Sequence, residues 1–415
     1  MEKICVAGLG YIGLPTSIFF ADKGYDVHGY DINERVVKSL QNKQIHIDEP
    51  GLVEKFLQSV ERGNLTFDHK PAEADVFMVA VPTPINENRK GNLSYVESAL
   101  KSILPYVKKG NLIIIESTIP PKTIEEFVVP IIKEQGFNPD ENEVFVAYCP
   151  ERVIPGKILD ELQNNDRIAG GYTEEAAGKA AALFSKNISG NVYETTALTA
   201  EMTKLMENTY RDVNIALANE LALVSEQLGV DAFEIISLAN KHPRVHIHSP
   251  GPGVGGHCIP IDPYFIIEKA EAHTPLIQRA REINEQMPHY VVDKINELKE
   301  THEIKNIALL GLSYKANVSD VRESPSLIIA EQLIAAGYNV KSHDPYVSEQ
   351  EVSVSLYSLE ESLREADLAL ILVDHNDFIN LPASAFNEMN QKLIFDTKKC
   401  IKPMEEITLY QLGNK

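Results

Sequence analysis

Short apolar runs rich in β-branched residues recur along the first part of the chain and end in turn residues. They occur at Lys3–Ala7, Tyr25–Tyr30, within Glu73–Pro84 and within Asn111–Pro121. Runs of this length, bounded by turn signals, are typical of strands buried on both faces of a parallel sheet. A helix is expected between the first two runs, ending near Gly24. The pattern predicts an α/β fold.

The last third of the chain repeats this pattern. The matching segments are Gly24–Val27 with Gly337–Val340, Glu73–Val76 with Glu365–Leu368, and Asp31 with Asp344. The second copy begins with an expected strand at Asn306–Leu310. Because both copies have the order of strands expected of a nucleotide-binding unit, we predict two Rossmann-like doubly wound domains.

Between the two copies, apolar residues follow a helical period from about Thr196 to Leu228. They are Met202, Leu205, Met206, Val213, Leu217, Leu221 and Val224. A helix longer than 25 residues commonly joins domains or pairs with a second copy of the chain. We therefore predict a central helical domain with one long spine helix that also forms a homodimer core. The expected domains are 1–195, 196–295 and 296–415.

Charge and length narrow the possible partners. The 415 residues include 39 Lys and Arg against 60 Asp and Glu, a formal net charge of −21. Such a chain is repelled by nucleic acid and by anionic membrane surfaces, so neither is an expected partner. The start of the sequence runs directly into an apolar strand without a recognisable export signal, and no apolar run has membrane-spanning length. The expected location is the cytoplasm.

The four cysteines, Cys5, Cys149, Cys258 and Cys400, are far apart in the sequence and form no CxxC pair. This spacing disfavours both a disulfide framework and a zinc ribbon. Each cysteine is therefore expected to be a free thiol.

The glycine motif GLGYIG, with Gly8, Gly10 and Gly13, directly follows the first expected strand and opens a helix. Asp31 follows 18 positions after the last glycine, at the end of the next strand. These glycines allow a pyrophosphate to approach the helix N-terminus, and the acidic residue can accept hydrogen bonds from ribose hydroxyls. Because Asp31 would repel a 2′-phosphate, the pattern favours NAD over NADP. The alternative is a tight turn that binds nothing.

Hydroxyl residues follow the next two strands. Thr83, Ser117 and Thr118 stand at carboxyl ends, which face the ligand crevice in a doubly wound sheet. They either contact a cofactor or simply end strands in turns.

The turn of the second copy lacks the glycine motif but offers Lys315, Arg322 and a helix beginning near Ser324. It suits a nucleotide diphosphate, unless this copy has lost its ligand and only packs.

One thiol stands in an unusual segment. Residues 249–264, SPGPGVGGHCIPIDPY, contain four glycines and five prolines, which exclude helix and regular strand. Cys258 in this loop, with Asp262 four residues later, is a candidate nucleophile, although a lone cysteine is ordinarily a small buried apolar residue. On the spine helix, Lys204 and Asn208 are four residues apart and can address one ligand oxygen, or form a solvated surface pair. An ammonium such as that of Lys204 would lower the pKa of the thiol.

Four histidines, His242, His246, His248 and His257, precede the cysteine. Pro243 interrupts any helix that would align them, and few carboxylates lie nearby, so no metal site is expected. Arg244 is a better ligand group, because a guanidinium can bind phosphate or sugar oxygens through two hydrogen bonds. It is otherwise an ordinary surface arginine.

Across nearly its whole length the chain resembles the UDP-glucose/GDP-mannose dehydrogenase family, and within it the branch that acts on UDP-N-acetyl-D-mannosamine. The resemblance rests on seven strings in family order: VAGLGYIGLP, VAVPTP, ESTIPP, YCPERVIPG, KLMENTYRDVNIALANE, HPRVHIHSPGPGVGGHCIPIDP and GLSYKANVSDVRESPS. It implies an NAD-binding first domain, a UDP-sugar-binding last domain, dimerisation through the long helix, and a role in surface polysaccharide biosynthesis.

The resemblance also implies a four-electron oxidation with two NAD+ per sugar. Cys258 would attack an aldehyde to give a thiohemiacetal, and then carry a thioester that water hydrolyses. Lys204 and Asn208 would stabilise the oxyanion, and Asp262 would assist proton transfer. Glu151 would activate the water, which Thr118 would help to position.

Further contacts follow from the same resemblance. Arg244 would reach the sugar nucleotide across the dimer, Lys315 would bind the UDP phosphate, and Arg322 would bind the cofactor pyrophosphate. The cofactor-binding set is Gly8, Gly10, Tyr11, Ile12, Gly13, Asp31, Arg35, Thr83, Thr118 and Arg322. The substrate-binding set is Glu151, Arg152, Val153, Lys204, Asn208, Arg211, Asn214, Arg244, His248, Gly255 and Lys315.

Two positions depart from the UDP-glucose members of the family, which typically carry Glu and Lys where this chain has Pro155 and Ile261. A less polar wall suits an N-acetyl group, so an amino sugar is expected. UDP-N-acetylglucosamine 6-dehydrogenases share these features, and the sequence does not separate the two C2 epimers. The remaining alternatives are a two-electron β-hydroxyacid-type dehydrogenase and a non-catalytic nucleotide-sugar sensor.

Overall fold

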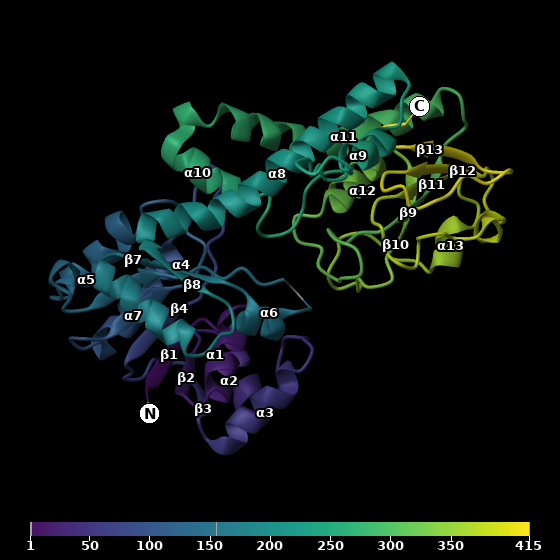
Figure 1. The fold of residues 1–415 in the computed structure, drawn as a ribbon. Helices are drawn as coiled ribbons and strands as arrows, with labels where there is room; N and C mark the ends of the chain where they lie inside the picture. The colour runs from purple at the N-terminus through teal and green to yellow at the C-terminus, as the bar shows by residue number, and fades with distance from the viewer. Residues whose placement is uncertain (1, 155, 415) are drawn as a thin grey trace. The chain divides into compact units, whose positions relative to one another are not determined.

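The computed structural model describes residues 2–154 and 156–414. The chain divides into two compact units (Figure 1), the first made of residues 1–207 with 264–270 and the second of residues 208–263 with 271–415. Each unit is built on its own sheet. The predicted three-part division of the sequence stays a prediction.

The first unit contains an eight-stranded sheet in the order β3-β2-β1-β4-β5-β6-β7-β8. Strand β7 pairs antiparallel with β6, and the other neighbours are parallel. The strands are β1 (Lys3–Ala7), β2 (Asp26–Tyr30), β3 (Leu65–Asp68), β4 (Val76–Val79), β5 (Leu112–Ile115), β6 (Phe145–Tyr148), β7 (Arg167–Gly171) and β8 (Val192–Thr196). The strand expected at residues 3–7 is confirmed with its bounds, and the next three expected runs each contain a strand.

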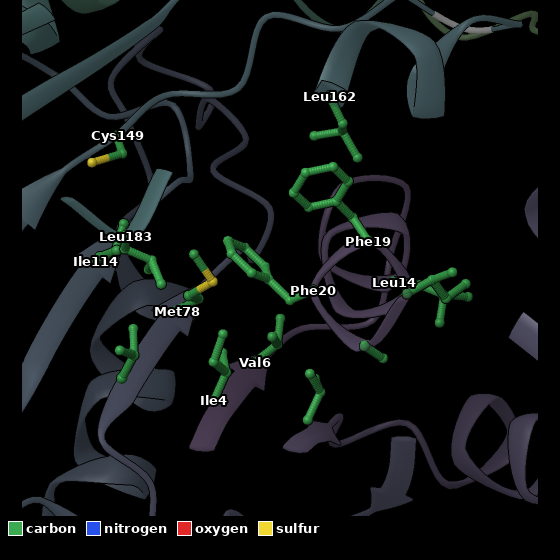
Figure 2. Packing of buried hydrophobic residues seen from close by; sticks show 14 of the residues in the cluster. Ile4, Val6, Leu14, Phe19, Phe20, Met78, Ile114, Cys149, Leu162 and Leu183 are labelled. Carbon is green, nitrogen blue, oxygen red and sulfur yellow. The ribbon is translucent and has the colours of Figure 1, made fainter. Parts of the chain in front are cut away.

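Alternate residues of the central strands supply two separate cores. Ile4 and Met78 belong to one apolar cluster and Cys5 and Phe77 to the other, because successive side chains of a strand point to opposite faces. Figure 2 shows Phe20 of helix α1 directed toward Met78 in the first cluster. The helices of this unit are α1 (Gly13–Asp22), α2 (Glu34–Gln41), α3 (Leu52–Arg62), α4 (Ser94–Ile103), α5 (Val129–Glu134), α6 (Ile158–Asn164) and α7 (Glu174–Ser185), with a π-helix at Ile124–Val128 before α5.

The second unit contains a five-stranded, all-parallel sheet in the order β10-β9-β11-β12-β13. The strands are β9 (Asn306–Leu310), β10 (Asn339–His343), β11 (Leu368–Ile371), β12 (Leu393–Asp396) and β13 (Thr408–Gln411). Its helices include α9 (Ala232–Ala239), α11 (Pro275–Lys299), α12 (Pro325–Ala335) and α13 (Leu359–Leu363). The strand predicted at residues 306–310 is confirmed, and Ser324 caps α12 as expected, its hydroxyl accepting a hydrogen bond from Ser326 N.

The predicted repeat extends to individual hydrogen bonds. Asp31, after β2, accepts a hydrogen bond from Leu9 N at 2.8 Å, and Asp344, after β10, accepts one from Leu312 N at 2.7 Å. In each copy a carboxylate therefore fixes the turn that follows the first strand. Two further matched pairs are Asp75 with Asp367, which bind the backbone at the start of β1 and β9, and Gly8 with Gly311, which both have a positive φ.

The long spine helix is confirmed as α8 (Ala197–Leu228), and the border between the two units crosses it after Glu207. Helix α10 (Asp262–Ala270) corrects one expectation, because the segment predicted to be irregular through Tyr264 already turns helical at Asp262. Pro263 is tolerated there because the first turn of a helix needs no backbone N–H donor. Within the described parts of the chain, no helix combines the length and apolarity needed to cross a membrane.

Candidate active site

The turn after β1 has the geometry that a bound pyrophosphate requires. Gly8 has a φ of +94°, and a Cβ atom added to it would lie 2.4 Å from the Ala80 carbonyl oxygen. A Cβ added to Gly13 would lie 1.9 Å from Gly8 O, so the start of α1 packs directly on the turn. A Cβ added to Gly10 meets no atom within 4 Å. Gly8 and Gly13 thus allow close packing of the backbone, and Gly10 between them faces open space.

Asp31 stands beside this turn. Its carboxylate accepts hydrogen bonds from Leu9 N and Asn33 N, both at 2.8 Å, and these bonds fix its orientation. Each carboxylate oxygen retains a second acceptor site, which suits the ribose hydroxyls of NAD. The glycine turn, the N-terminus of α1 and Asp31 together fit the cofactor predicted from the sequence.

The other predicted cofactor contacts come from three places. Tyr11 follows the turn, and its hydroxyl donates to the carboxylate of Glu49. Thr83 donates to the carbonyl oxygen of Thr118 and so ties together the segments after β4 and β5. Arg35 is exposed in the first turn of α2. Ile12 is partly buried and directly precedes α1.

The segment after β6 carries Glu151, Arg152 and Val153. Glu151 accepts a hydrogen bond from Arg152 N at 2.7 Å, and its other oxygen lies 2.5 Å from Nη2 of Arg167. Arg152 forms an ion pair at 2.8 Å with Glu207 of α8. Val153 is partly buried. The predicted departure at Pro155 lies outside the described residues.

In the second unit, Cys258 stands one turn before α10. Its carbonyl oxygen accepts hydrogen bonds from Ile261 N at 3.1 Å and Asp262 N at 2.9 Å. Of the four cysteines, all of which the structure describes, only this one is exposed. Burial raises the pKa of the Cys5 thiol to about 11, and it raises the pKa values of Cys149 and Cys400 as well. Accessibility therefore distinguishes Cys258 from the other three thiols, because a thiol must be accessible to meet a substrate.

The glycines before Cys258 let its loop pack closely on the turn that follows β9. A Cβ added to Gly255 would lie 2.6 Å from the Glu323 carbonyl oxygen, and Gly256, at a φ of +88°, donates to Arg322 O at 3.1 Å. Gly256 also lies against the ring of Tyr314. Gly255, predicted to contact substrate, thus has a packing function that no other residue could provide at this distance.

Arg322 brings a positive charge to the thiol. Burial raises the pKa of Tyr314, and the charges of Asp320 and Cys258 raise it further. The pKa of Arg322 is raised mainly by its hydrogen bond to Asp320, with a smaller contribution from the charge of Cys258. Arg322 and Asp320 form two parallel hydrogen bonds of 2.8 and 2.5 Å. The predicted cofactor ligand Arg322 is therefore also a cation near the thiol, a neighbour that the sequence had suggested only for Lys204.

Asn208 and Asp262 meet in the structure. The amide of Asn208 donates to Asp262 Oδ2 at 2.6 Å, and both residues are buried. Lys204 stands one turn before Asn208 on α8. The structure thus brings together two of the candidate site residues, one from the spine helix and one from the cysteine loop.

The histidine-rich segment is held by the side chain of Asn214. Its amide nitrogen donates to His246 O at 2.7 Å, and its oxygen accepts from His248 N at 2.9 Å. This residue, predicted to bind substrate, uses both amide groups to fix the backbone. Burial, followed by the charges of Arg211 and His246, lowers the pKa of His248 and favours its neutral form.

The remaining predicted substrate ligands are exposed cations in the second unit. Arg244 lies 3.5 Å from His242 Nε2, and Arg211 lies near enough to His248 to influence its charge. Lys315 is exposed, and its backbone oxygen accepts a hydrogen bond from Ser313 at 2.9 Å. These side chains extend into solvent, where an anionic ligand can reach them.

The sequence analysis missed three charged or polar residues that lie beside predicted site residues, each within its own unit. Tyr314 lines the cysteine loop, and Arg167 and Glu116 lie at one end of the first sheet. Burial raises the pKa of Glu116 to about 8, with Arg167 opposing the shift. A Glu directly after a buried strand was a visible signal for Glu116, whereas nothing in the sequence distinguishes Arg167 from a surface arginine.

Comparison with known proteins places this geometry in one family. Three domain descriptions of the UDP-glucose/GDP-mannose dehydrogenase family match the chain: the NAD binding domain over residues 2–188, the central domain over 198–286 and the UDP binding domain over 308–403. The UDP-N-acetyl-D-mannosamine dehydrogenase of Methanocaldococcus jannaschii is 44% identical, over 100% of this chain and 97% of that protein.

Solved structures agree with this assignment. The UDP-N-acetyl-mannosamine dehydrogenase of Staphylococcus aureus is 47% identical with a TM-score of 0.90, covering 100% of this chain and 98% of the other. An enzyme described as the UDP-D-ManNAc dehydrogenase of Pyrococcus horikoshii is 41% identical with a TM-score of 0.92, covering 99% of both chains. The chain therefore belongs to the UDP-glucose/GDP-mannose dehydrogenase family, and its first domain is the NAD-binding domain of that family.

Proposed function

We propose that the protein oxidises C6 of UDP-N-acetyl-D-mannosamine to the carboxylate, giving UDP-N-acetyl-D-mannosaminuronate with two NAD+ consumed. The observation that carries the proposal is the exposed thiol of Cys258, held in a glycine-rich loop before α10. A thiol in this setting suits covalent capture of an aldehyde. The substrate is supported by the relatives from M. jannaschii and S. aureus, which share 44% and 47% identity.

The reaction divides into two oxidations and one hydrolysis. Bound NAD+ supplies the acceptor for the hydride released in each oxidation. The first oxidation converts the C6 alcohol to an aldehyde, and the sulfur of Cys258 then adds to the carbonyl carbon to form a thiohemiacetal. Loss of a second hydride gives a thioester on the same sulfur. Lys204 and the amide of Asn208 stabilise the negative oxygen that develops at C6.

Proton transfer is assigned to two carboxylates. Asp262, which accepts a hydrogen bond from Asn208, takes part in proton transfer during the oxidations. In the hydrolysis, Glu151 removes a proton from water as the water oxygen bonds to the acyl carbon. The carbon–sulfur bond breaks and its electron pair returns to Cys258. Thr118 helps to position the water.

Binding of the sugar nucleotide is assigned to exposed groups of the second unit. Lys315 binds a UDP phosphate, Arg322 reaches the cofactor pyrophosphate, and Arg244 contacts the sugar nucleotide of a second subunit.

A homodimer through α8 is supported by large apolar side chains that are exposed on this helix: Leu198, Met206, Tyr210, Leu217, Val224 and Leu228. We place the reaction in the cytoplasm and assign its product to surface polysaccharide biosynthesis.

Other nucleotide sugars are the nearest alternatives. UDP-N-acetylglucosamine differs from the proposed substrate only at C2. A relative from Ralstonia nicotianae that is 40% identical, over 96% of both chains, is described as an NDP-N-acetyl-D-galactosaminuronic acid dehydrogenase. A two-electron dehydrogenase or a nucleotide-sugar sensor would leave Cys258 without a chemical role.

NADH absorbance with a panel of substrates tests the proposal. UDP-N-acetylmannosamine should give two NADH per sugar with a kcat/KM at least tenfold above those for UDP-N-acetylglucosamine, UDP-N-acetylgalactosamine, UDP-glucose and GDP-mannose. Cys258→Ala should abolish turnover while retaining the thermal stabilisation produced by NAD, which controls for folding. One NADH per sugar with a stable aldehyde, binding without turnover, or full turnover by Cys258→Ala would each refute the proposal.

A further inference from the structure

The antiparallel strand β7 brings an arginine to the carboxyl end of β6. Tyr148 of β6 pairs with Gly170 of β7, and continuing this register by three residues sets Glu151 opposite Arg167. On the other side of β6, Tyr148 pairs with Ile115, so the next residue, Glu116, also reaches this end of the sheet. The topology thus gathers one guanidinium and two carboxyl groups within the first unit.

The contacts of Arg167 are unequal. Its Nη2 atom lies 2.5 Å from an oxygen of Glu151, and its Nη1 atom lies 3.8 Å from Glu116. The side chain of Arg167 is 4% exposed, and its guanidinium carbon lies 4.8 Å from the ring centre of Phe184. An arginine enclosed in this way has little conformational freedom, so it holds the Glu151 carboxylate in one place.

One buried cation cannot neutralise two carboxylates. A second negative charge in this low-dielectric interior is costly, and the usual response is that one carboxyl group keeps its proton. Burial, reinforced by Glu151, raises the pKa of Glu116 to about 8 even though Arg167 opposes the shift. The other groups that face Glu116 are Thr16 on α1 and the thiol of Cys149. The raised pKa therefore favours the protonated form of Glu116.

We propose that Arg167 is a positioning residue that orients the carboxyl group of Glu151 for thioester hydrolysis, with Glu116 lying behind it. This inference rests on the role proposed above for Glu151. As a carboxylate, Glu151 can take the proton from the attacking water while the carbon–sulfur bond of the thioester breaks. Without the guanidinium, the carboxyl group of Glu151 would lose the 2.5 Å contact that fixes its orientation.

The experiment follows the covalent intermediate directly. Enzyme is mixed with NAD+ and UDP-N-acetylmannosamine, quenched in acid, and weighed by intact-protein mass spectrometry, while NADH is recorded from the same mixture. Arg167→Gln should still form two NADH per site in the first turnover. Its steady-state rate should then fall about 100-fold, in the range expected for the loss of a general base, and an adduct on Cys258 should accumulate.

Two conservative variants separate this role from a structural one. Arg167→Lys, which retains the cation, should have a steady-state rate at least tenfold higher than that of Arg167→Gln. Glu116→Gln, which imitates the protonated side chain, should stay within about threefold of the wild-type rate, in accord with a neutral Glu116. The double variant Arg167→Gln with Glu116→Gln leaves fewer unpaired buried charges than Arg167→Gln alone, so it provides a folded reference if Arg167→Gln unfolds. The double variant should also accumulate the adduct on Cys258.

Glu151→Gln distinguishes failure of the inference from failure of the proposed function. If this variant accumulates the adduct but the Arg167 variants do not, the positioning role is wrong and the role of Glu151 stands. If Glu151→Gln also accumulates no adduct, the hydrolytic role of Glu151 falls and the inference falls with it. Wild-type turnover in Arg167→Gln, or a rate loss without adduct that Arg167→Lys does not rescue, would equally overturn the assignment.

Discussion

The buried carboxyl group of Glu116 gives a prediction about stability that needs no substrate. The change is Glu116→Gln, which keeps the shape of the side chain and removes its titration. Burial raises the pKa of Glu116 to about 8 in the folded protein, against an ordinary value of 4.5. Between these two values the folded state holds one proton more than the unfolded state, so rising pH removes stability from the wild-type protein.

The size of the effect follows from the linkage between protons and folding. One proton corresponds to about 1.4 kcal/mol per pH unit, so the wild-type protein should lose up to about 2.7 kcal/mol relative to the variant between pH 5.5 and 7.5. For a domain of about 200 residues this is roughly 3–6 °C in Tm per pH unit. The stability that a neutral Glu116 provides is fully present below pH 4.5 and is lost as the pH rises through about 8.

Thermal unfolding of both proteins across this pH range measures the effect. Subtracting the two Tm curves removes every titration that the proteins share, and Glu61→Gln, an exposed glutamate on α3, serves as the matched control. The gap between Glu116→Gln and wild type should widen in favour of the variant as the pH rises, and the control should show no such trend. A constant gap, or one that widens toward acid, would show that Glu116 is ionised in the folded protein.

Three further predictions concern the glycine turn and two buried aspartates. Gly10→Ala should leave Tm unchanged and raise the Kd for NAD at least tenfold by calorimetry, because its Cβ atom would project into open space. Gly13→Ala should instead lower Tm by several degrees, because its Cβ atom would fall 1.9 Å from Gly8 O; equal Tm values for the two variants would contradict this division. Asp262→Asn should lower kcat about 100-fold with little change in KM in the NADH assay, and an unchanged kcat would remove Asp262 from proton transfer. Burial of Asp344 opposes ionisation, but hydrogen bonds from His375 and the backbone lower its pKa to about 2. The ionised carboxylate therefore stabilises the folded protein fully above pH 3.8, and this stabilisation is lost as the pH falls through about 2. Asp344→Asn should therefore cost about 1–2 kcal/mol in urea unfolding at pH 7 and less near pH 3, and a pH-independent penalty would argue against the lowered pKa.

Local patterns were sufficient to predict much of the fold. The strand at residues 3–7 and the doubled α/β unit follow from short apolar runs with glycines at fixed spacing, and the long helix α8 follows from a helical period sustained over many turns. The sequence repeat predicts that Asp31 and Asp344 hold equivalent positions in the two units, and each carboxylate binds the backbone of its own turn. Such features are predictable because the groups that interact are close in the chain or belong to a recurring supersecondary unit.

Other features depended on the tertiary structure. The sequence predicts Asn214 as a substrate ligand, which stays a prediction, and it gives no sign that both polar groups of this amide are hydrogen-bonded to the histidine-rich segment. Arg322 was assigned to the cofactor, and the fold also brings it near Cys258, 64 positions earlier in the sequence. Neither partnership has a signature at the sequence level, because each joins residues that only the packed chain brings together.

The end of the first sheet shows this difference most clearly. The sequence by itself determined that Glu116 follows a buried strand and that Glu151 lies in the string YCPER. Only the antiparallel pairing of β7 set Arg167 opposite Glu151, and only burial decided that Glu116 retains a proton. Strand direction and local dielectric are properties of the assembled sheet, so the contact between Arg167 and Glu151 and the raised pKa of Glu116 come from the fold and not from the order of residues in the chain.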